Sequence, residues 1–174
     1  MEDGSGRTES ATRSQGTPHD TVIDALGLLL RAGPEQLDTA IVSVLHRLGT
    51  AVGAERALLC TAGPTGWRLT HQWHAPSCDA AADCLNGRSV LEIVDDPDAL
   101  AEGRPLVYPD LASLPEGALP RTVLDSGVQA MALVPLVSDA GVSGIIGLQR
   151  LRGPGGFDAT GLWMARALSD GLGS

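Results

Sequence analysis

Two apolar segments near the end of the chain place the tightest constraint on its fold. Residues 128–137 and 142–151 have the length and aliphatic content of β-strands, and only the loop Ser138-Asp139-Ala140-Gly141 separates them. A connection this short joins neighbouring antiparallel strands, whereas parallel strands need a crossover of about a dozen residues or more. We therefore expect an antiparallel hairpin here, with a sheet built around it.

Three earlier segments are predicted to extend this sheet. Residues 55–62 are largely apolar, as in a buried central strand. Residues 67–74 alternate, which places four larger side chains on one predicted face: Trp67, Leu69, His71 and Trp73. A brief apolar run at 105–108 completes the set. The sequence thus predicts an antiparallel sheet, with helices packed on its faces.

Helical periodicity occurs at both ends of the chain. Thr17-Pro18-His19-Asp20 is a helix start, and an N-terminal helix is predicted over 17–33 with an apolar stripe of Val22, Ile23, Leu26, Leu29 and Leu30. A second helix is predicted from the spacing of Leu37, Ala40, Ile41, Val44, Leu45, Leu48 and Val52. A last helix is expected from about Asp158 to Leu172, and the stretch from Ala75 to Gly127 is irregular with short helical turns.

Composition narrows the function. The 174 residues suit one domain, preceded at 1–16 by a polar tail expected to be flexible. The net charge of -9 disfavours nucleic-acid binding, and every basic residue is Arg, which excludes a Schiff-base lysine and a phosphate-loop lysine. No segment has the length of a membrane span or the apolar core of a secretory signal, so we expect a cytoplasmic protein that binds no membrane.

Five pieces of the sequence, in order, resemble the GAF domain family over about residues 36–173. They are Leu48–Leu59 (helix into first strand), Trp67–Trp73 (second strand), Gly103–Leu111 with Leu114-Pro115 (a G-x-P segment ending in Asp and an apolar residue), Gly127–Leu136 (a glycine turn into a strand ending V-P-L) and Gly144–Leu148 (a glycine-containing partner strand). Ala130 stands where the family commonly has Ser. The domain is accordingly assigned to residues 34–174.

The resemblance implies an α+β fold with a central antiparallel sheet of five to six strands. The terminal helices would cover one face, and the irregular segment the other, with a pocket beneath it. Side chains expected near that pocket, either as ligand contacts or as ordinary core, are His71, Trp73, Leu91, Val94, Tyr108, Met131 and Leu133. Such a domain would be a sensor that binds a small ligand and signals through its terminal helices to an output module or partner. A ligand-free dimerisation or interaction module is the alternative. The sequence names no ligand or cofactor.

Cysteine and histidine residues suggest other chemistries, but their positions disfavour each. His71 and His74 are predicted on opposite faces of one strand and, with Cys78 and Cys84, match no metal signature, so no metal is expected. GAF enzymes that reduce free methionine sulfoxide need a reactive thiolate, whereas Cys60 lies within an apolar strand and residues 108–128 contain no further cysteine. Neither Cys78 nor Cys84 precedes a His, as a bilin-binding cysteine usually does. We therefore predict no catalysis.

The stripe on the N-terminal helix needs cover, because that helix lies outside the minimal GAF core. We predict a homodimer through the terminal helices; packing of the helix against the rest of its own chain is the alternative.

Overall fold

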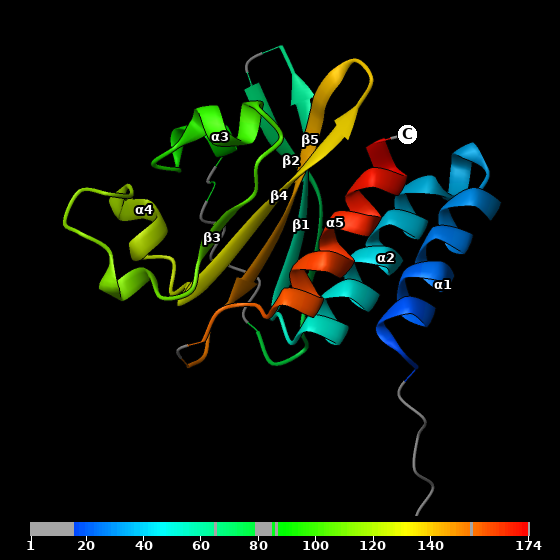
Figure 1. The fold of residues 1–174 in the computed structure, drawn as a ribbon, viewed down its shortest axis with the longest axis horizontal. Helices are drawn as coiled ribbons and strands as arrows, with labels where there is room; N and C mark the ends of the chain where they lie inside the picture. The colour runs from blue at the N-terminus through cyan, green and yellow to red at the C-terminus, as the bar shows by residue number, and fades with distance from the viewer. Residues whose placement is uncertain (1–15, 65, 79–84, 86, 154, 174) are drawn as a thin grey trace, which may run out of the picture.

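A five-stranded antiparallel sheet forms the centre of the computed structural model, which describes residues 16–64, 66–78, 85, 87–153 and 155–173. The strand order is β2-β1-β5-β4-β3, with β4 and β5 forming the expected hairpin (Figure 1). The bounds are β1 Arg56–Gly63, β2 Gly66–His74, β3 Leu106–Tyr108, β4 Ala130–Ser138 and β5 Gly141–Arg150. Each lies close to its predicted range, so the predicted fold class and all five predicted strands are confirmed.

Helices α2 Leu37–Val52 and α5 Ala159–Gly173 cover one face of the sheet, and α1 Pro18–Arg31 packs against these two helices on their outer side (Figure 1). A single 3-10 turn, η1 Pro34–Gln36, joins α1 to α2. Helix α2 ends at Gly53, which adopts the left-handed conformation that glycine tolerates best. Apolar side chains from all three helices meet those from β1, β4 and β5, including Val44, Leu45, Leu48, Leu59, Val134, Ile146 and Leu168. This cluster is the helix-side core.

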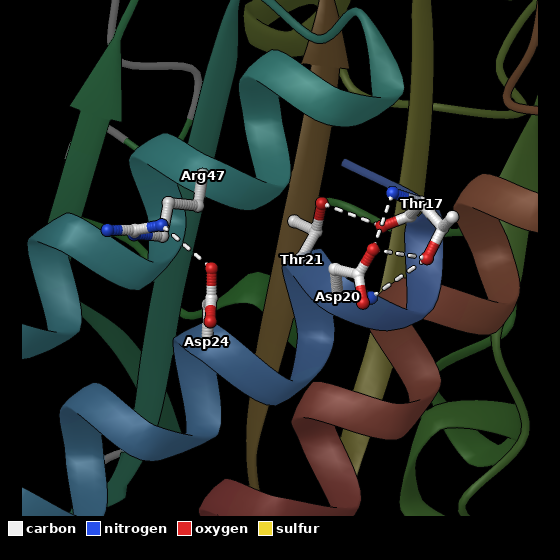
Figure 2. A network of polar contacts seen from close by, with 5 residues as sticks. All are labelled: Thr17, Asp20, Thr21, Asp24 and Arg47. Carbon is white, nitrogen blue, oxygen red and sulfur yellow. Dashed lines mark hydrogen bonds and ion pairs between the residues drawn. The ribbon is translucent and has the colours of Figure 1, made fainter. Parts of the chain in front are cut away.

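Helix α1 is fixed at its start and docked along its length. Thr17 and Asp20 form a reciprocal capping box, in which the Thr17 hydroxyl accepts from the Asp20 backbone N–H at 3.2 Å (Figure 2). Val22 and Ala25 are buried in the helix-side core, whereas Ile23 and Leu30 are 66% and 87% exposed. The predicted stripe is therefore divided: one part packs on its own chain, and the other is uncovered.

The helical turns between β2 and β4 lie on the opposite face of the sheet (Figure 1). They are η2 Val90–Glu92, α3 Pro97–Ala101, η3 Leu111–Ser113 and α4 Arg121–Leu124, while β3 joins the edge of the sheet. We call the described residues between β2 and β4, other than β3, the insertion. Its apolar residues meet those of the sheet in a second core, which includes Cys60, Val90, Ile93, Leu100, Tyr108, Met131, Leu133 and Ile145. The two cores are separated by one sheet.

Strand β2 contains an irregularity that the sequence did not reveal. Leu59 pairs with His71, but the next residue, Cys60, pairs with Leu69, so Thr70 has no partner in the register. The Thr70 hydroxyl donates to the Leu59 carbonyl at 3.1 Å at this point. An extra residue reverses the inward and outward alternation of a strand. The prediction that Trp67, Leu69, His71 and Trp73 share one face is therefore wrong: the first two pack on the insertion side and Trp73 on the helix side.

Candidate ligand site between the sheet and the insertion

A small cavity lies where the insertion covers the sheet. It has a volume of about 10 Å³, which is room for roughly one water molecule. Strands β1, β4 and β5 supply its floor and the insertion supplies its cover: Leu58, Cys60, Met131, Leu133, Ile145, Gly147 and Gln149 below, with Leu85, Val90 and Ile93 above. In this conformation the space beneath the insertion is almost filled by side chains.

Gln149 is the polar side chain in this otherwise apolar lining. Its residue is 1% exposed, and its Nε2 lies 4.0 Å from the Met131 sulfur. A buried amide can donate and accept, so it can orient a ligand in a site whose other contacts are non-directional. Gln149 is not among the residues predicted from the sequence to lie near the pocket. The usable signal was its alternation with Ile145 and Gly147 on β5, which places it on the insertion side.

Tyr108 and Asp95 connect β3 to the insertion by a hydrogen bond that the tyrosine hydroxyl donates to the carboxylate Oδ1. Tyr108 is 5% exposed. Its burial, together with this bond to Asp95, raises the pKa of the phenol well above its usual value. The hydroxyl is therefore a neutral donor throughout the physiological range, and Asp95 accepts from it.

Local caps hold the rest of the insertion in place. The Ser89 side chain accepts from the backbone N–H of Leu91 within η2 and from that of Trp67 on β2, the latter at 3.1 Å. Asp96 caps α3, since its Oδ1 accepts from the Ala99 N–H at 3.0 Å. The cover of the cavity is thus attached to the sheet at β2 and, through Tyr108, at β3.

The seven residues predicted near the pocket fall on two faces. Five lie in the core beneath the insertion: Leu91, Val94, Tyr108, Met131 and Leu133. The irregularity in β2 places His71 and Trp73 on the helix side. There His71 Nε2 lies 3.0 Å from the Asp38 carboxylate of α2, and the Trp73 ring stacks on His46 at 5.3 Å between centroids. Contact of any of the seven with a ligand stays a prediction.

The cysteines offer no assembled reactive centre in the described part of the chain. Cys60 is 2% exposed within β1, as expected, and Cys78 is half-buried. Cys84 lies outside the described residues. Among the residues that the structure describes, no three His, Cys, Asp or Glu side chains are grouped so that they could hold a metal ion. Likewise, none of the described helices is both long and apolar enough to cross a membrane.

Comparison with known families identifies the fold. The GAF domain family matches residues 36–172. The chain belongs to the GAF family. Helix α1 lies before the matched range, whereas the sheet, the insertion and α5 lie within it, the last to within one residue. The GAF assignment made from the five sequence pieces is confirmed.

Solved structures of GAF domains share this architecture at low sequence identity. The chromophore-binding domain of the bacteriophytochrome RpBphP3 from R. palustris has a TM-score of 0.71 at 15% identity, over 89% of this chain and 58% of that one. GAF3 from Slr1393 of Synechocystis sp. PCC6803 has a TM-score of 0.64 at 14% identity, over 78% and 90%. The chromophore-binding domain of Stigmatella aurantiaca phytochrome P1 has a TM-score of 0.65 at 18% identity, over 99% and 63%. A comparison with curated proteins found no match. These similarities establish the fold.

Proposed function

We propose that this GAF domain is a cytoplasmic signal-input module, which binds a small ligand beneath the insertion and relays its presence through the terminal helices. The observation that carries the proposal is the two-sided packing of β4. Met131 and Leu133 line the cavity, and the intervening Ala132 and the following Val134 lie in the helix-side core. Helix α5 packs over this second face. A ligand that displaces β4 therefore acts on α5 across a single strand.

The lining suggests the kind of ligand. Apolar side chains surround one buried amide, that of Gln149. This arrangement suits a mainly apolar small molecule with one hydrogen-bonding group. A molecule larger than water requires the insertion to move, and the Tyr108–Asp95 bond is one contact that such movement would break. Two of the similar solved structures are chromophore-binding domains. They support the proposal that this fold can hold a small molecule, but they do not identify the ligand.

Adjacent residues of β4 supply a matched pair of variants. Leu133→Phe adds volume on the cavity side, and Val134→Leu adds volume on the helix side. Thermal-shift screening of a small-molecule library against the wild type should find a compound that raises the melting temperature. Leu133→Phe should lose that response and Val134→Leu should keep it. A response lost equally in both variants, or in neither, would place the ligand elsewhere.

A homodimerisation module is the second candidate, favoured by exposed apolar side chains on the outer helices. Ile23 and Leu30 of α1 are exposed, and so is Trp163 of α5 at 41%, whose ring is tilted against that of His19 with 4.6 Å between their centroids. Exposed apolar patches of this kind commonly mark protein contacts. Sedimentation velocity over a range of concentrations should show a dimer that Leu30→Glu converts to monomer. A wild-type monomer at every concentration would remove this candidate. Whether the domain is a monomer or a dimer, we propose that an output module or partner protein contacts the terminal helices and responds to changes in them.

A further inference from the structure

A groove with a volume of about 740 Å³ opens at one end of the helix layer, on the other side of the sheet from the cavity beneath the insertion. Helices α1 and α5 begin at this end and α2 ends there (Figure 1). The groove falls within the size range of small-molecule sites, which is about 300–1,000 Å³. Two arginines, Arg47 and Arg150, line it in a chain whose net charge is -9.

Arg150 contributes a half-buried cation whose described partners carry no full negative charge. Its guanidinium donates to the Val52 carbonyl at 3.0 Å and to the Gly155 carbonyl at 3.4 Å. It also lies 5.1 Å from the centroid of the Phe157 ring. These contacts hold the group in a fixed position, and they leave its charge only partly compensated. A fixed, partly desolvated guanidinium is well suited to bind an oxyanion.

Arg47 approaches the groove from α2 and is held only loosely. Its nearest acidic partner is Asp24 of α1, at 3.8 Å, and the two side chains are 45% and 68% exposed (Figure 2). An exposed pair at this distance contributes little, so a ligand can compete for the arginine. Replacing Asp24 by a neutral residue removes this competitor and should raise the affinity of Arg47 for an anionic ligand.

The remaining polar residues of the groove are neutral or already paired. Thr21, Thr50 and Thr160 line it, and the Thr21 hydroxyl donates to the Thr17 carbonyl at 3.3 Å. The starts of α1 and α5 border the groove, and each is capped by a carboxylate, Asp20 in α1 and Asp158 in α5, where Asp158 Oδ1 accepts from the Gly161 N–H at 2.7 Å. The positive charge of the groove therefore comes from Arg47 and Arg150.

We propose that this groove binds the phosphate group of a small molecule, with Arg47 and Arg150 as its cationic contacts. A phosphate has several anionic oxygens in different directions, so it can accept hydrogen bonds from more than one arginine. Because α1, α2 and α5 all border the groove, its occupant would bear on the same helices that the proposed relay uses. The site does not depend on a ligand beneath the insertion.

Titration of the full chain with inorganic phosphate and with pyrophosphate, at constant ionic strength, tests the proposal. Amide chemical shifts of Thr50, Gly156 and Gly161 should change and reach saturation. Arg47→Gln should weaken pyrophosphate binding by about tenfold or more, the effect of losing one charge-assisted hydrogen bond. Asp24→Asn should tighten binding. Arg31→Gln, at the far end of α1, removes the same charge away from the groove and should leave the affinity unchanged.

Three results would overturn the proposal: shifts that never saturate, shifts centred away from the groove, or equal weakening by Arg47→Gln and Arg31→Gln. Equal weakening by the two variants would indicate that pyrophosphate is attracted to the positive charges of the protein in general and not to the groove. Circular dichroism melting of each variant verifies that it folds, which is expected because Arg47, Asp24 and Arg31 are all exposed.

Discussion

The Tyr108 hydroxyl donates a hydrogen bond to the Asp95 carboxylate, and this contact joins the edge strand β3 to the insertion that covers the cavity. Tyr108→Phe should lower the free energy of unfolding by about 1 kcal/mol, because one hydrogen bond to a charged acceptor is lost while the exposed Asp95 is rehydrated. Asp95→Asn retains an acceptor and should cost less. Urea unfolding measures both, and equal stability of Tyr108→Phe and wild type would show that the bond does not hold the insertion.

The same contact predicts a dependence on alkaline pH. Tyr108 is the sole tyrosine of the chain, and burial, followed by Asp95, raises its pKa in the folded state. Above a pH of about 10 the unfolded chain loses the phenol proton while the folded chain retains it, so stability falls as pH rises. Ultraviolet absorbance of tyrosinate should appear at higher pH in folded protein than in urea. Asp95→Asn should narrow that gap, and coincident titrations would contradict the prediction.

Two helical glycines should respond oppositely to alanine. A Cβ on Gly49 of α2 would collide with the Trp73 ring, whereas one on Gly27 of α1 would meet the mobile end of the Arg31 side chain. Gly49→Ala should therefore destabilise the fold by about 1–3 kcal/mol, as overpacking does. Gly27→Ala should stabilise it by up to about 1 kcal/mol through helix propensity. Thermal unfolding of both variants is the measurement, and changes of the same sign would refute the packing argument.

The Trp73–Gly49 contact also marks the limit of sequence reasoning. The positions of helices and strands were predictable because spacing and turn residues are local: β2 and α2 lie in the ranges that their patterns indicate. The side of the sheet to which each β2 side chain points was not predictable. The unpaired Thr70 leaves the alternation of residue types intact while reversing which way the later side chains point, so His71 and Trp73 were assigned to the wrong side of the sheet.

Contacts between segments that are distant in the sequence could not be predicted from local patterns either. Asp95 and Asp96 are adjacent and chemically alike, yet they have different roles in the fold. Asp96 caps α3, whereas Asp95 accepts a hydrogen bond from Tyr108 across the insertion. The five pocket residues that lie together were predictable because the family resemblance places β3, β4 and the insertion side by side. The arginine-lined groove depends on tertiary packing that no local pattern encodes, whereas the side of the sheet on which Gln149 lies follows from its alternation with Ile145 and Gly147 on β5.

The prediction that this domain has no catalytic activity can be tested by a direct assay. Cys60 is buried in β1 and Cys78 is half-buried, so we expect no reduction of free methionine sulfoxide with a thiol reductant. Wild type, Cys78→Ser and Cys84→Ser should all be indistinguishable from buffer. Turnover by the wild type that disappears in either variant would establish an enzyme instead.

Ligand binding beneath the insertion is the central claim, and native mass spectrometry of freshly purified protein, before and after incubation with a bacterial small-molecule extract, tests it most directly. The wild type and Val134→Leu should carry one additional small molecule per chain, and Leu133→Phe should carry none. If the wild type shows only the mass of its polypeptide under both conditions, or if Leu133→Phe retains the added mass, the claim is contradicted.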